Sequence, residues 1–469
     1  MNLPPDFLAS ISKLLESDTD SFLSALKKES PVSIRFNPFK IQRNPLHPFD
    51  SIETPVPWSK YGSYLKERPS FTFDPLFHAG YYYVQEASSM FIANIVSQLF
   101  KDPVTCLDLC AAPGGKSTDL LSVLPQGSLL VSNEIIRHRA NILSETMIKF
   151  GHSASVVTNN EAKDFLKTEV DFDLILVDAP CSGEGMFRKD EISIQEWTTT
   201  NVKMCAARQK KILDDIWPTL KPGGVIIYST CTYNTLENED NALYIANELG
   251  AEFIEIKIDK EYNITPSFHE EAKGYRFFPH KTKGEGLFIT VLRKSTSNRS
   301  ENQVLQHKNN LESNKKGKKN NKSSSIFLKD SSQYSKYLYS PDEFDYLEHN
   351  NRIIALPKAH LTTLLNLKHS LKIVSMGIEI GELKGKDFIP SHVLAMSLEL
   401  NSSSFGKKDL SYTEAIAYLR REAISLPDSP KGFILLTFKK EPIGFVKNIG
   451  NRANNLYPKE WRIIKDITK

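Results

Sequence analysis

Short apolar runs alternate with helical stretches through the middle of the chain, and this alternation restricts the possible folds more than any other feature. The apolar runs are residues 104–109, 128–133, 155–157, 173–177 and 225–229. Helical stretches open at Lys116 and cover 137–150 and 200–220, and Pro222-Gly223-Gly224 is a stop signal before the next strand. The pattern predicts an α/β fold with a parallel, doubly wound sheet. A last run, 286–292, is expected to add an antiparallel strand at the edge of the sheet.

The segments before and after this sheet lack its regular alternation of apolar runs and helical stretches. We place the sheet domain at residues 76–295. Residues 1–75 start with an amphipathic stretch and continue into a strand-like run, which predicts a small α+β appendage. Residues 331–469 combine strand-like runs at 432–438 and 443–447 with a helix near 413–424. This mixture predicts a compact, partly β accessory region.

A basic and polar segment, residues 296–330, separates the sheet domain from the accessory region. Between Ser295 and Ser325, seven Lys or Arg residues stand against two Glu residues, which gives +5 in a chain whose total is +3. A segment rich in Asn, Ser and Lys cannot bury a core, so we predict a disordered linker. It is either a solvated tether or a flexible arm that attracts phosphates.

The remaining composition excludes several classes of protein. No stretch reaches the roughly 18 consecutive apolar residues of a membrane span. The amino terminus lacks the basic start and apolar core of a signal peptide, so we expect a cytoplasmic protein with no membrane contact. The five cysteines include no Cys-x2-Cys pair, which argues against zinc and favours reduced thiols over disulfides. We expect no bound metal and a monomer.

Two cysteines each follow an apolar run. Cys181 lies in Asp178-Ala179-Pro180-Cys181, and Cys231 lies in Ser229-Thr230-Cys231-Thr232. The carboxyl ends of strands in an open α/β sheet line the crevice in which ligands bind, and thiolate is the nucleophilic form of cysteine. Two thiols placed in this way predict a reaction with two roles for cysteine. Cys106 and Cys205 are expected to be small buried residues.

A glycine pair marks a strand-to-helix turn, where the sequence reads Cys110-Ala111-Ala112-Pro113-Gly114-Gly115-Lys116. Glycine lets the backbone approach a ligand closely, and the following helix start offers free N–H groups to a carboxylate or phosphate. The spacing fits neither the dinucleotide fingerprint nor the phosphate loop. Glu134, roughly 20 residues further on, is placed like the acid that holds ribose hydroxyls in such sheets. Together these features predict a nucleoside cofactor with an amino-acid tail.

Five motifs in the first 295 residues occur together and in one order. They are residues 83–90, 108–116, 178–187, 228–232 and 279–286. In this order they resemble the Nop/Sun family of S-adenosylmethionine-dependent RNA cytosine-5 methyltransferases. The tail, notably 444–447 and 455–462, is similar to the PUA-like end of the bacterial RsmF branch, which modifies small-subunit ribosomal RNA. The resemblance implies a Rossmann-like class I methyltransferase core, S-adenosylmethionine as cofactor, and 16S rRNA or the small ribosomal subunit as partner.

The same resemblance assigns roles to single residues. C5 of cytosine is too poor a nucleophile to take a methyl group unaided, so such enzymes first add a thiolate to C6. The resemblance gives this attack to Cys231, and it gives Cys181 the release of the product by helping to remove the C5 proton. Asp178 is expected to hydrogen-bond the cytosine edge or the surroundings of the cofactor. Residues 110–116 and Glu134 are expected to line the cofactor.

One motif departs from the family pattern. Many relatives carry an aspartate near the third strand for the adenine of the cofactor, whereas this chain reads Thr158-Asn159-Asn160-Glu161. We expect Glu161 or Asn160 to take its place.

The substrate RNA is expected to be single-stranded or to lie at a junction, because a target base must leave its stack to reach a thiol in a cleft. Basic residues in the appendage, beside Cys181 and in the tail are candidates for phosphate contacts. They are Arg35, Arg188, Lys189, Lys447, Arg452 and Lys459.

Other interpretations remain open from the sequence. The same chemistry could act on tRNA or another RNA. A DNA cytosine-5 methyltransferase would use Cys181 as its nucleophile and would leave Cys231 without a role. A non-catalytic ribosome-assembly factor could bind RNA alone. A thiol-redox protein is disfavoured, because the two cysteines are far apart in the sequence and no Cys-x-x-Cys pair exists.

Overall fold

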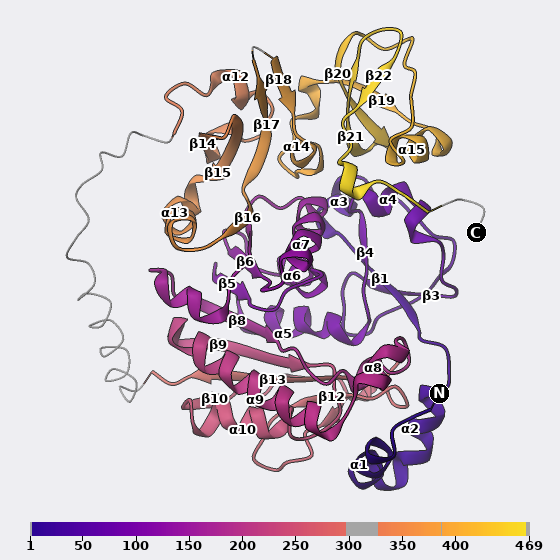
Figure 1. The fold of residues 1–469 in the computed structure, drawn as a ribbon, viewed down its shortest axis with the longest axis vertical. Coiled ribbons are helices and arrows are strands. Elements are labelled where there is room, and N and C mark those ends of the chain that lie inside the picture. Colours follow the sequence, from indigo (N-terminus) through magenta and orange to yellow (C-terminus); the bar gives the residue numbers. More distant parts are fainter. Residues whose placement is uncertain (1, 297–326, 386, 466–469) are drawn as a thin grey trace, which may run out of the picture.

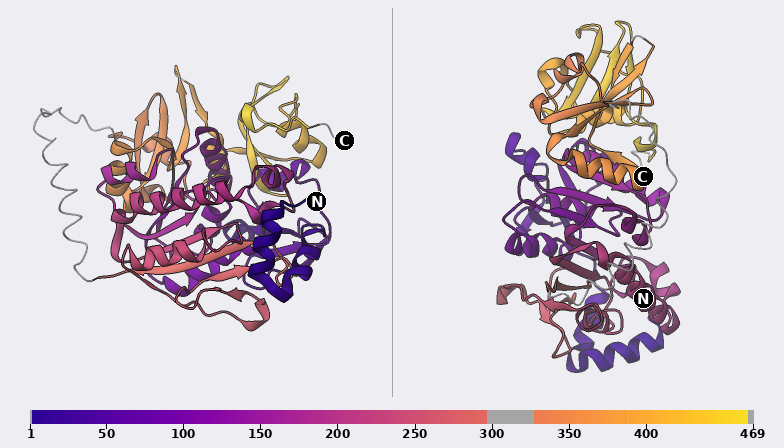
Figure 2. Two further views of the ribbon diagram at one scale, coloured as in Figure 1. Left: turned by 60° about the horizontal axis from the view of Figure 1, so that its bottom comes forward. Right: turned by 90° about the vertical axis from the view of Figure 1, so that its left-hand side faces the viewer.

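The computed structural model describes residues 2–296, 327–385 and 387–465, so most of the predicted linker 296–330 lies outside the described residues. A central mixed sheet is accompanied by one amino-terminal and two carboxyl-terminal sheets (Figure 1). The carboxyl-terminal sheets lie at one end of an elongated molecule and the first two helices lie at the other (Figure 2). Within the described ranges, no helix has the length and apolar character needed to cross a membrane.

The central sheet has the order β11-β12-β13-β9-β8-β5-β6-β7-β16, with β10 beside β13. Its strands are β5 (Thr105–Asp108), β6 (Leu129–Asn133), β7 (Ser155–Thr158), β8 (Phe172–Asp178), β9 (Leu220–Thr230), β10 (Ala251–Phe253), β11 (Thr265–Pro266), β12 (Tyr275–Phe277), β13 (Leu287–Lys294) and β16 (Ile373–Met376). Strands β7, β6, β5, β8 and β9 run parallel, which confirms the predicted doubly wound sheet. These strands are apolar on both faces because helices cover both faces.

Helices pack on the two faces of this sheet in separate apolar clusters. One face is covered by α5 (Phe91–Leu99), α6 (Gly115–Leu121) and α7 (Arg137–Phe150). The other is covered by α9 (Thr199–Ile216), α10 (Glu239–Asn247) and α13 (Leu361–Ser370). The short helix α8 (Glu191–Glu196) precedes α9.

Two strands differ from the sequence prediction. Strand β9 begins before Pro222-Gly223-Gly224 rather than after it. Leu220 pairs with Phe172 and the register then shifts, so that residues 221–224 bulge out before Val225 pairs with Leu174. Strand β13 is antiparallel to β9 as expected, but it does not form the edge, because β12 and β11 pair beyond it.

The amino-terminal part contains one antiparallel sheet in the order β2-β3-β1-β4. Its elements are α1 (Pro5–Leu15), α2 (Thr19–Leu26), β1 (Val32–Phe36), α3 (Pro38–Arg43), β2 (Ile52–Pro55), β3 (Gly62–Leu65), α4 (Pro75–His78) and β4 (Tyr82–Val84). Helices α1 and α2 pack against aromatic side chains of the central domain instead of against this sheet. The Phe7 ring centroid lies 5.0 Å from that of Phe187, and the Phe22 centroid lies 5.0 Å from that of Tyr233 and 6.2 Å from that of Phe278.

The carboxyl-terminal part forms two four-stranded sheets, β14-β15-β17-β18 and β19-β20-β21-β22. Its elements are α12 (Ser332–Ser335), β14 (Phe344–His349), β15 (Arg352–Pro357), β17 (Ile378–Lys384), β18 (Asp387–Pro390), α14 (His392–Met396), β19 (Gly406–Asp409), α15 (Tyr412–Leu419), β20 (Gly432–Phe438), β21 (Glu441–Asn448) and β22 (Ala453–Asn455). The second sheet packs against the amino-terminal sheet, because Ile34 and Leu76 share an apolar cluster with Leu436 and Tyr457.

One strand from beyond the linker belongs to the central sheet. Strand β16 pairs antiparallel with β7, with Ile373 opposite Thr158 and Met376 opposite Val156. The central sheet therefore continues past residue 331, where we expected the accessory region to begin.

Candidate active site

The carboxyl ends of β8 and β9 bring the two predicted cysteines together. The strands are parallel neighbours with Asp178 opposite Ser229, so the residues that follow leave the sheet at the same edge. Sγ of Cys181 lies 3.3 Å from Sγ of Cys231. Both thiols are free and half-buried. Each cysteine therefore keeps some surface that a ligand can reach.

Contact between the two sulfurs keeps Cys181 protonated. The hydrogen bond with Cys231, together with burial and the charges of Cys231 and Glu237, raises the pKa of Cys181 well above its usual value. A thiol with a raised pKa holds its proton at neutral pH and is a poor nucleophile. Cys181 is therefore suited to donating a hydrogen bond to the neighbouring sulfur.

A buried glutamate, Glu237, joins the two loops that carry the cysteines. It accepts hydrogen bonds from N and Oγ of Ser182 at 3.0 and 2.5 Å, and from Gln209 and Asn234 at 2.7 and 2.8 Å. Burial raises the pKa of Glu237 although these hydrogen bonds oppose the shift. Because Ser182 follows Cys181 directly, Glu237 fixes the first loop to the second.

A second buried glutamate, Glu184, also connects the two loops that carry the cysteines. It accepts from the backbone N–H groups of Tyr233 and Asn234 at 2.7 and 3.0 Å, and from Nε1 of Trp197 at 3.0 Å. The motif 178–187 contains Glu184, but no local pattern in the sequence distinguishes a buried carboxylate from a solvated one. We predicted a role for neither glutamate.

The glycine after Glu184 allows the loops to touch. The Gly185 N–H donates to the carbonyl of Cys231 at 2.8 Å, and a Cβ at position 185 would lie 2.8 Å from that oxygen. A side chain there would push the two loops, and with them the two thiols, apart.

Asp178 forms an ion pair with Lys116 beside the thiols. Nζ of Lys116 lies 2.9 Å from Oδ2 of Asp178, and Oγ of Ser229 donates to Oδ1 at 2.8 Å. Burial opposes the charge of Lys116, but the attraction and hydrogen bond of Asp178 outweigh burial and raise its pKa, with Cys231 acting in the same direction. The arrangement places a cationic donor next to an anionic acceptor near the two sulfurs.

The turn between β5 and α6 carries the other predicted cofactor residues, Cys110 to Lys116. Gly114 has a φ of 110°, and a Cβ there would lie 2.8 Å from Cγ2 of Thr146 on α7. The N–H of Ala111 donates to the carbonyl of Asn133 at 2.8 Å, which ties the turn to the end of β6. The Ala112–Pro113 peptide bond within the turn is cis. Glycine is thus required for the turn to lie this close to α7.

Asp108 ends β5 below this turn. Its Oδ2 accepts from Oγ of Ser117 at 2.6 Å, whereas its Oδ1 is buried with no hydrogen-bond partner among the described residues. Burial raises the pKa of Asp108 to about 7. A cofactor with polar groups fits here, because it can satisfy the unpartnered oxygen.

Glu134 lies buried just after β6. Its Oε1 accepts from the N–H of Ile136 at 2.9 Å, and its Oε2 pairs with Arg139 at 3.3 Å. Arg139 also donates to the carbonyl of Ala112 at 2.9 Å, so Glu134 is connected to the cofactor turn. A carboxylate oxygen accepts more than one hydrogen bond, which leaves capacity for ribose hydroxyls.

The two candidates for the adenine side are placed differently. Glu161 is about half exposed and pairs with Lys163 at 2.6 Å. Asn160 is buried, and its side chain bonds to both the N–H and the carbonyl of Lys372, at 3.0 and 3.2 Å. Contact of either residue with the cofactor stays a prediction.

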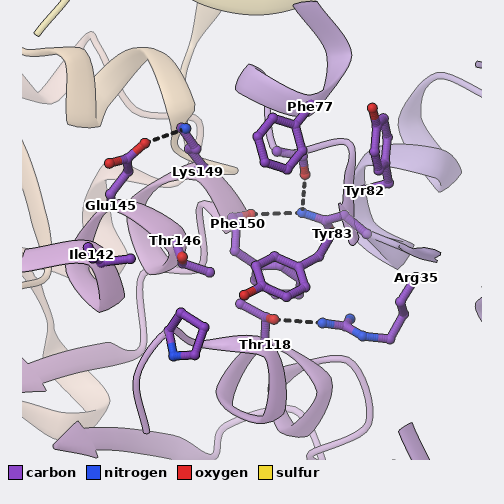
Figure 3. Close-up of a pocket in the computed structure, with 13 residues that line it drawn as sticks. Arg35, Phe77, Tyr82, Tyr83, Thr118, Ile142, Glu145, Thr146, Lys149 and Phe150 are labelled. Carbon is purple, nitrogen blue, oxygen red and sulfur yellow. Dashed lines mark hydrogen bonds and ion pairs between the residues drawn. The ribbon is translucent and has the colours of Figure 1, made fainter. Parts of the chain in front are cut away.

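Two of the six candidate phosphate contacts are wrong, because their side chains are buried in ion pairs. Arg35 is 1% exposed, lies 3.2 Å from Asp119 and donates to Oγ1 of Thr118 at 2.6 Å, a bond drawn in Figure 3. It holds the amino-terminal sheet on α6. Arg188 is 6% exposed and pairs with Glu285 at 3.0 Å. The other four candidates keep exposed surface: Lys189, Lys447, Arg452 and Lys459.

A cavity of about 220 Å³ lies between the amino-terminal sheet and helices α6 and α7 (Figure 3). Phe77, Tyr82, Tyr83 and Phe150 give it a largely aromatic lining, and Pro113 of the cofactor turn borders it. Neither thiol lines this cavity. The candidate active site is therefore not this cavity but the strand ends that carry the two thiols and the Lys116–Asp178 pair.

Family models match three parts of the chain. The model described as 16S rRNA methyltransferase RsmB/F matches residues 99–293. The N-terminal domain of 16S rRNA methyltransferase RsmF matches residues 3–87, and the methyltransferase RsmF PUA domain matches residues 406–463. All three descriptions name RsmF, and the matches run from residue 3 to residue 463, so the chain is similar to RsmF-type 16S rRNA methyltransferases along most of its length.

Individual relatives cover nearly the whole chain. Ribosomal RNA small subunit methyltransferase F of Shewanella sediminis (strain HAW-EB3) is 28% identical across 98% of this chain and 97% of its own length. The protein of the same description from Salmonella agona (strain SL483) is 29% identical across 97% of this chain and 96% of its own.

Solved structures share the fold of the central part. A methyltransferase homolog protein from Pyrococcus horikoshii is 26% identical with a TM-score of 0.51, covering 62% of this chain and all of that one. NSun6 from the same organism, solved with SFG, has a TM-score of 0.52 at 19% identity, covering 63% of this chain and 99% of that one. Taken with the family models and the relatives, the chain is an RNA methyltransferase that uses S-adenosylmethionine.

Proposed function

We propose that the chain methylates C5 of cytosine in RNA through a covalent bond between Cys231 and C6 of the base. The observation that carries the proposal is the 3.3 Å approach of the two thiols beside the Lys116–Asp178 pair. A reaction that attaches a base and later releases it has work for two thiols, and the raised pKa of Cys181 supports giving the attack to the other thiol.

Cys231 performs the attack. Its thiolate adds to C6, and the ring becomes enamine-like with an electron-rich C5. Lys116 donates to the ring nitrogen N3 and offsets the negative charge that develops on the base, while Asp178 accepts from the exocyclic amino group. A preorganised donor next to an acceptor matches this edge of cytosine and stabilises the charge where it forms.

The cofactor residues are proposed as predicted. S-adenosylmethionine supplies a methyl group carried on a positively charged sulfur. Residues 110–116 border it, Asp178 lies beside it and Glu134 accepts hydrogen bonds from the ribose. Glu161 remains a candidate on the adenine side.

Cys181 completes the reaction after C5 has taken the methyl group. Once Cys231 is bonded to C6, the hydrogen bond and the charge by which it raises the pKa of Cys181 are lost, so Cys181 releases its proton to solvent more easily. Cys181 then helps to remove the C5 proton. The electrons of the C5–H bond re-form the C5–C6 double bond, the C6–S bond breaks, and Cys231 leaves as a thiolate.

The substrate is proposed to be 16S rRNA, free or within the small ribosomal subunit. The family descriptions and the names of the relatives support this assignment. We further propose that the chain acts in the cytoplasm as a monomer. The four exposed basic side chains described above are proposed to contact phosphates.

Incubation with tritiated S-adenosylmethionine and ribosomal RNA or subunits tests the thiol roles on a denaturing gel. A protein–RNA band that accumulates in Cys181→Ala and is absent in Cys231→Ala is the expected result. Cys205→Ala, which removes a buried thiol of α9, is the matched control and should behave as wild type. Accumulation in Cys231→Ala instead would exchange the two roles and favour the chemistry of a DNA-type enzyme.

Digestion of the labelled RNA to nucleosides tests the position of the methyl group. We expect the tritium in 5-methylcytidine. Label in any other nucleoside contradicts the C5 chemistry, and label in tRNA but not in 16S rRNA contradicts the substrate assignment.

A further inference from the structure

Three asparagines join the strand from beyond the linker to the cofactor side of the sheet. Asn133 ends β6, and Asn159 and Asn160 directly follow β7. The N–H of Asn159 donates to the carbonyl of Lys372 at 3.0 Å. Asn160 brackets the same residue by accepting from its N–H and donating to its carbonyl. Lys372 directly precedes β16, so the amide groups hold the start of that strand at the carboxyl end of β7.

The same network reaches the cofactor turn. The side-chain nitrogen of Asn133 donates to the carbonyls of Leu109 and Asn160 at 3.1 and 3.0 Å, and its oxygen accepts from the N–H of Asn160 at 3.0 Å. Nδ2 of Asn159 donates to the carbonyls of Glu134 and Ile135, both at 2.8 Å. The segment that contains Glu134 is therefore bonded through Asn159 to Lys372.

Buried side-chain amides with several hydrogen bonds fix the backbone segments that they connect, because breaking one bond leaves a buried polar group unpaired. Ligands of an open α/β sheet bind outside the carboxyl ends of the strands. With Glu134 at the ribose, the next strand end, that of β7, borders the adenine. Lys372 lies at this strand end and comes from beyond the linker.

We infer that Asn160 is a positioning residue, and that its clamp on Lys372 makes the carboxyl-terminal part of the chain a structural component of the cofactor site. Asn160 acts through Lys372 and Asn133 rather than by touching the cofactor. Release of the clamp lets the β7 end and the Glu134 segment move, so affinity for S-adenosylmethionine falls. The inference rests on the proposed placement of the ribose at Glu134.

Calorimetric titration of the full chain with S-adenosylmethionine, without RNA, tests this inference. Asn160→Ala removes both bonds of the Asn160 side chain to Lys372 and leaves the bond from the Asn159 N–H. We expect about 3- to 10-fold weaker binding, which is the worth of roughly one net buried hydrogen bond. Ser375→Ala is the matched control, because it removes a 3.0 Å bond from β16 to Ser144 of α7 and leaves the clamp intact. We expect its affinity to stay within twofold of wild type.

Lys372→Pro reaches the same clamp from the other side. Proline removes the N–H that donates to Asn160, and Leu371 is already extended, with φ −118° and ψ 157°, as a residue before proline prefers. We expect weaker binding than wild type but a loss no larger than that of Asn160→Ala, because the carbonyl at position 372 still accepts from Asn160. The double variant should bind no more weakly than the weaker single variant, because both changes break one interaction.

Two outcomes overturn the inference. One is wild-type affinity in both Asn160→Ala and Lys372→Pro. The other is additive losses in the double variant, which would mean independent effects. Glu134→Gln separates the inference from its premise. If Glu134→Gln binds as wild type, the ribose placement is wrong, whereas weak binding in Glu134→Gln with normal binding in Asn160→Ala overturns the clamp alone.

A kinetic measurement distinguishes positioning from general damage. We expect Asn160→Ala to raise KM for S-adenosylmethionine by the same factor as the dissociation constant, with kcat and KM for RNA nearly unchanged. Equal loss in all three parameters would indicate general damage and would overturn the assigned role.

Discussion

The two ends of the parallel sheet's active edge are built in different ways. At the thiol end, after β8 and β9, two buried carboxylates of Glu184 and Glu237 each accept several hydrogen bonds. At the cofactor end, after β6 and β7, neutral amides of three asparagines make the connections, and one partner, Lys372, comes from beyond the linker. The thiol end is thus connected by carboxylates whose partners all lie before the linker. The cofactor end is connected by amides, and these also bond to a residue that lies after the linker.

This difference suggests a division of labour. Buried carboxylates hold the two sulfurs rigidly, as a covalent reaction requires, because removing such a group leaves several donors unpaired. Breaking a hydrogen bond of the amide network is expected to cost less free energy than removing one of these carboxylates. Changes at the thiol end should therefore affect chemistry and folding together, whereas changes at the cofactor end should affect affinity.

Removal of Glu237 should have the largest effect. Glu237→Ala leaves donors of Ser182, Gln209 and Asn234 unpaired, so we expect a loss of about 3 kcal/mol in unfolding free energy, together with loss of methyl transfer. Urea unfolding and a transfer assay measure the two effects. Glu248→Ala, at an exposed position on the same side of the sheet, should cost less than about 0.5 kcal/mol. Equal losses in the two variants would break the contrast between the ends.

Removal of the Lys116 ammonium group should have the second largest effect. Lys116→Met leaves Asp178 without its cation beside the thiols, and we expect methyl transfer to slow by about 100-fold in single-turnover experiments. Lys221→Met is the matched control, since Lys221 pairs with Asp173 at 2.8 Å near the opposite edge of the sheet. It should stay within about twofold of wild type. Similar rates in both variants would remove Lys116 from the chemistry.

Asp108, on the strand between the two ends, should produce a smaller, pH-dependent effect. Burial raises its pKa to about 7 in the folded protein, so the folded state holds the proton more tightly than the unfolded state. Its contribution to stability is complete below the ordinary carboxyl pKa of 3.8 and is lost as the pH rises to about 7. Asp108→Asn should flatten the fall in unfolding free energy over this range. Parallel pH curves for the variant and wild type would contradict the assignment.

The smallest effect is expected outside both ends, at the exposed Lys459. Lys459→Ala should weaken RNA binding by about two- to threefold and lower the salt dependence by a slope of roughly 0.7 to 0.9. Filter binding at several salt concentrations measures both. Glu460→Gln, the neighbouring exposed acid, should not weaken binding. An unchanged slope in Lys459→Ala would mean that Lys459 contacts no phosphate.

The thiol positions could be predicted from sequence because their signals are local. Cys181 and Cys231 directly follow strand-forming runs, and parallel strands end at one edge of a sheet. The burial of Glu184 and Glu237 could not be predicted, because it arises only when two distant loops meet. The predicted phosphate contact of Arg35 was wrong for the same reason, since its partner Asp119 lies on a helix of another domain. Strand β16 is a four-residue run whose partner β7 lies far earlier in the chain, and no local pattern connects the two.

The packing of α1 and α2 has a consequence for synthesis on the ribosome. Phe22 is translated early, but its partners Tyr233 and Phe278 emerge far later, about 10 to 50 s at roughly 5 to 20 residues per second. Helices α1 and α2 are thus made first and dock late, after the domain that they cover has folded. Until then their apolar face is open to chaperones, and release from the ribosome before residue 278 would leave that face uncovered.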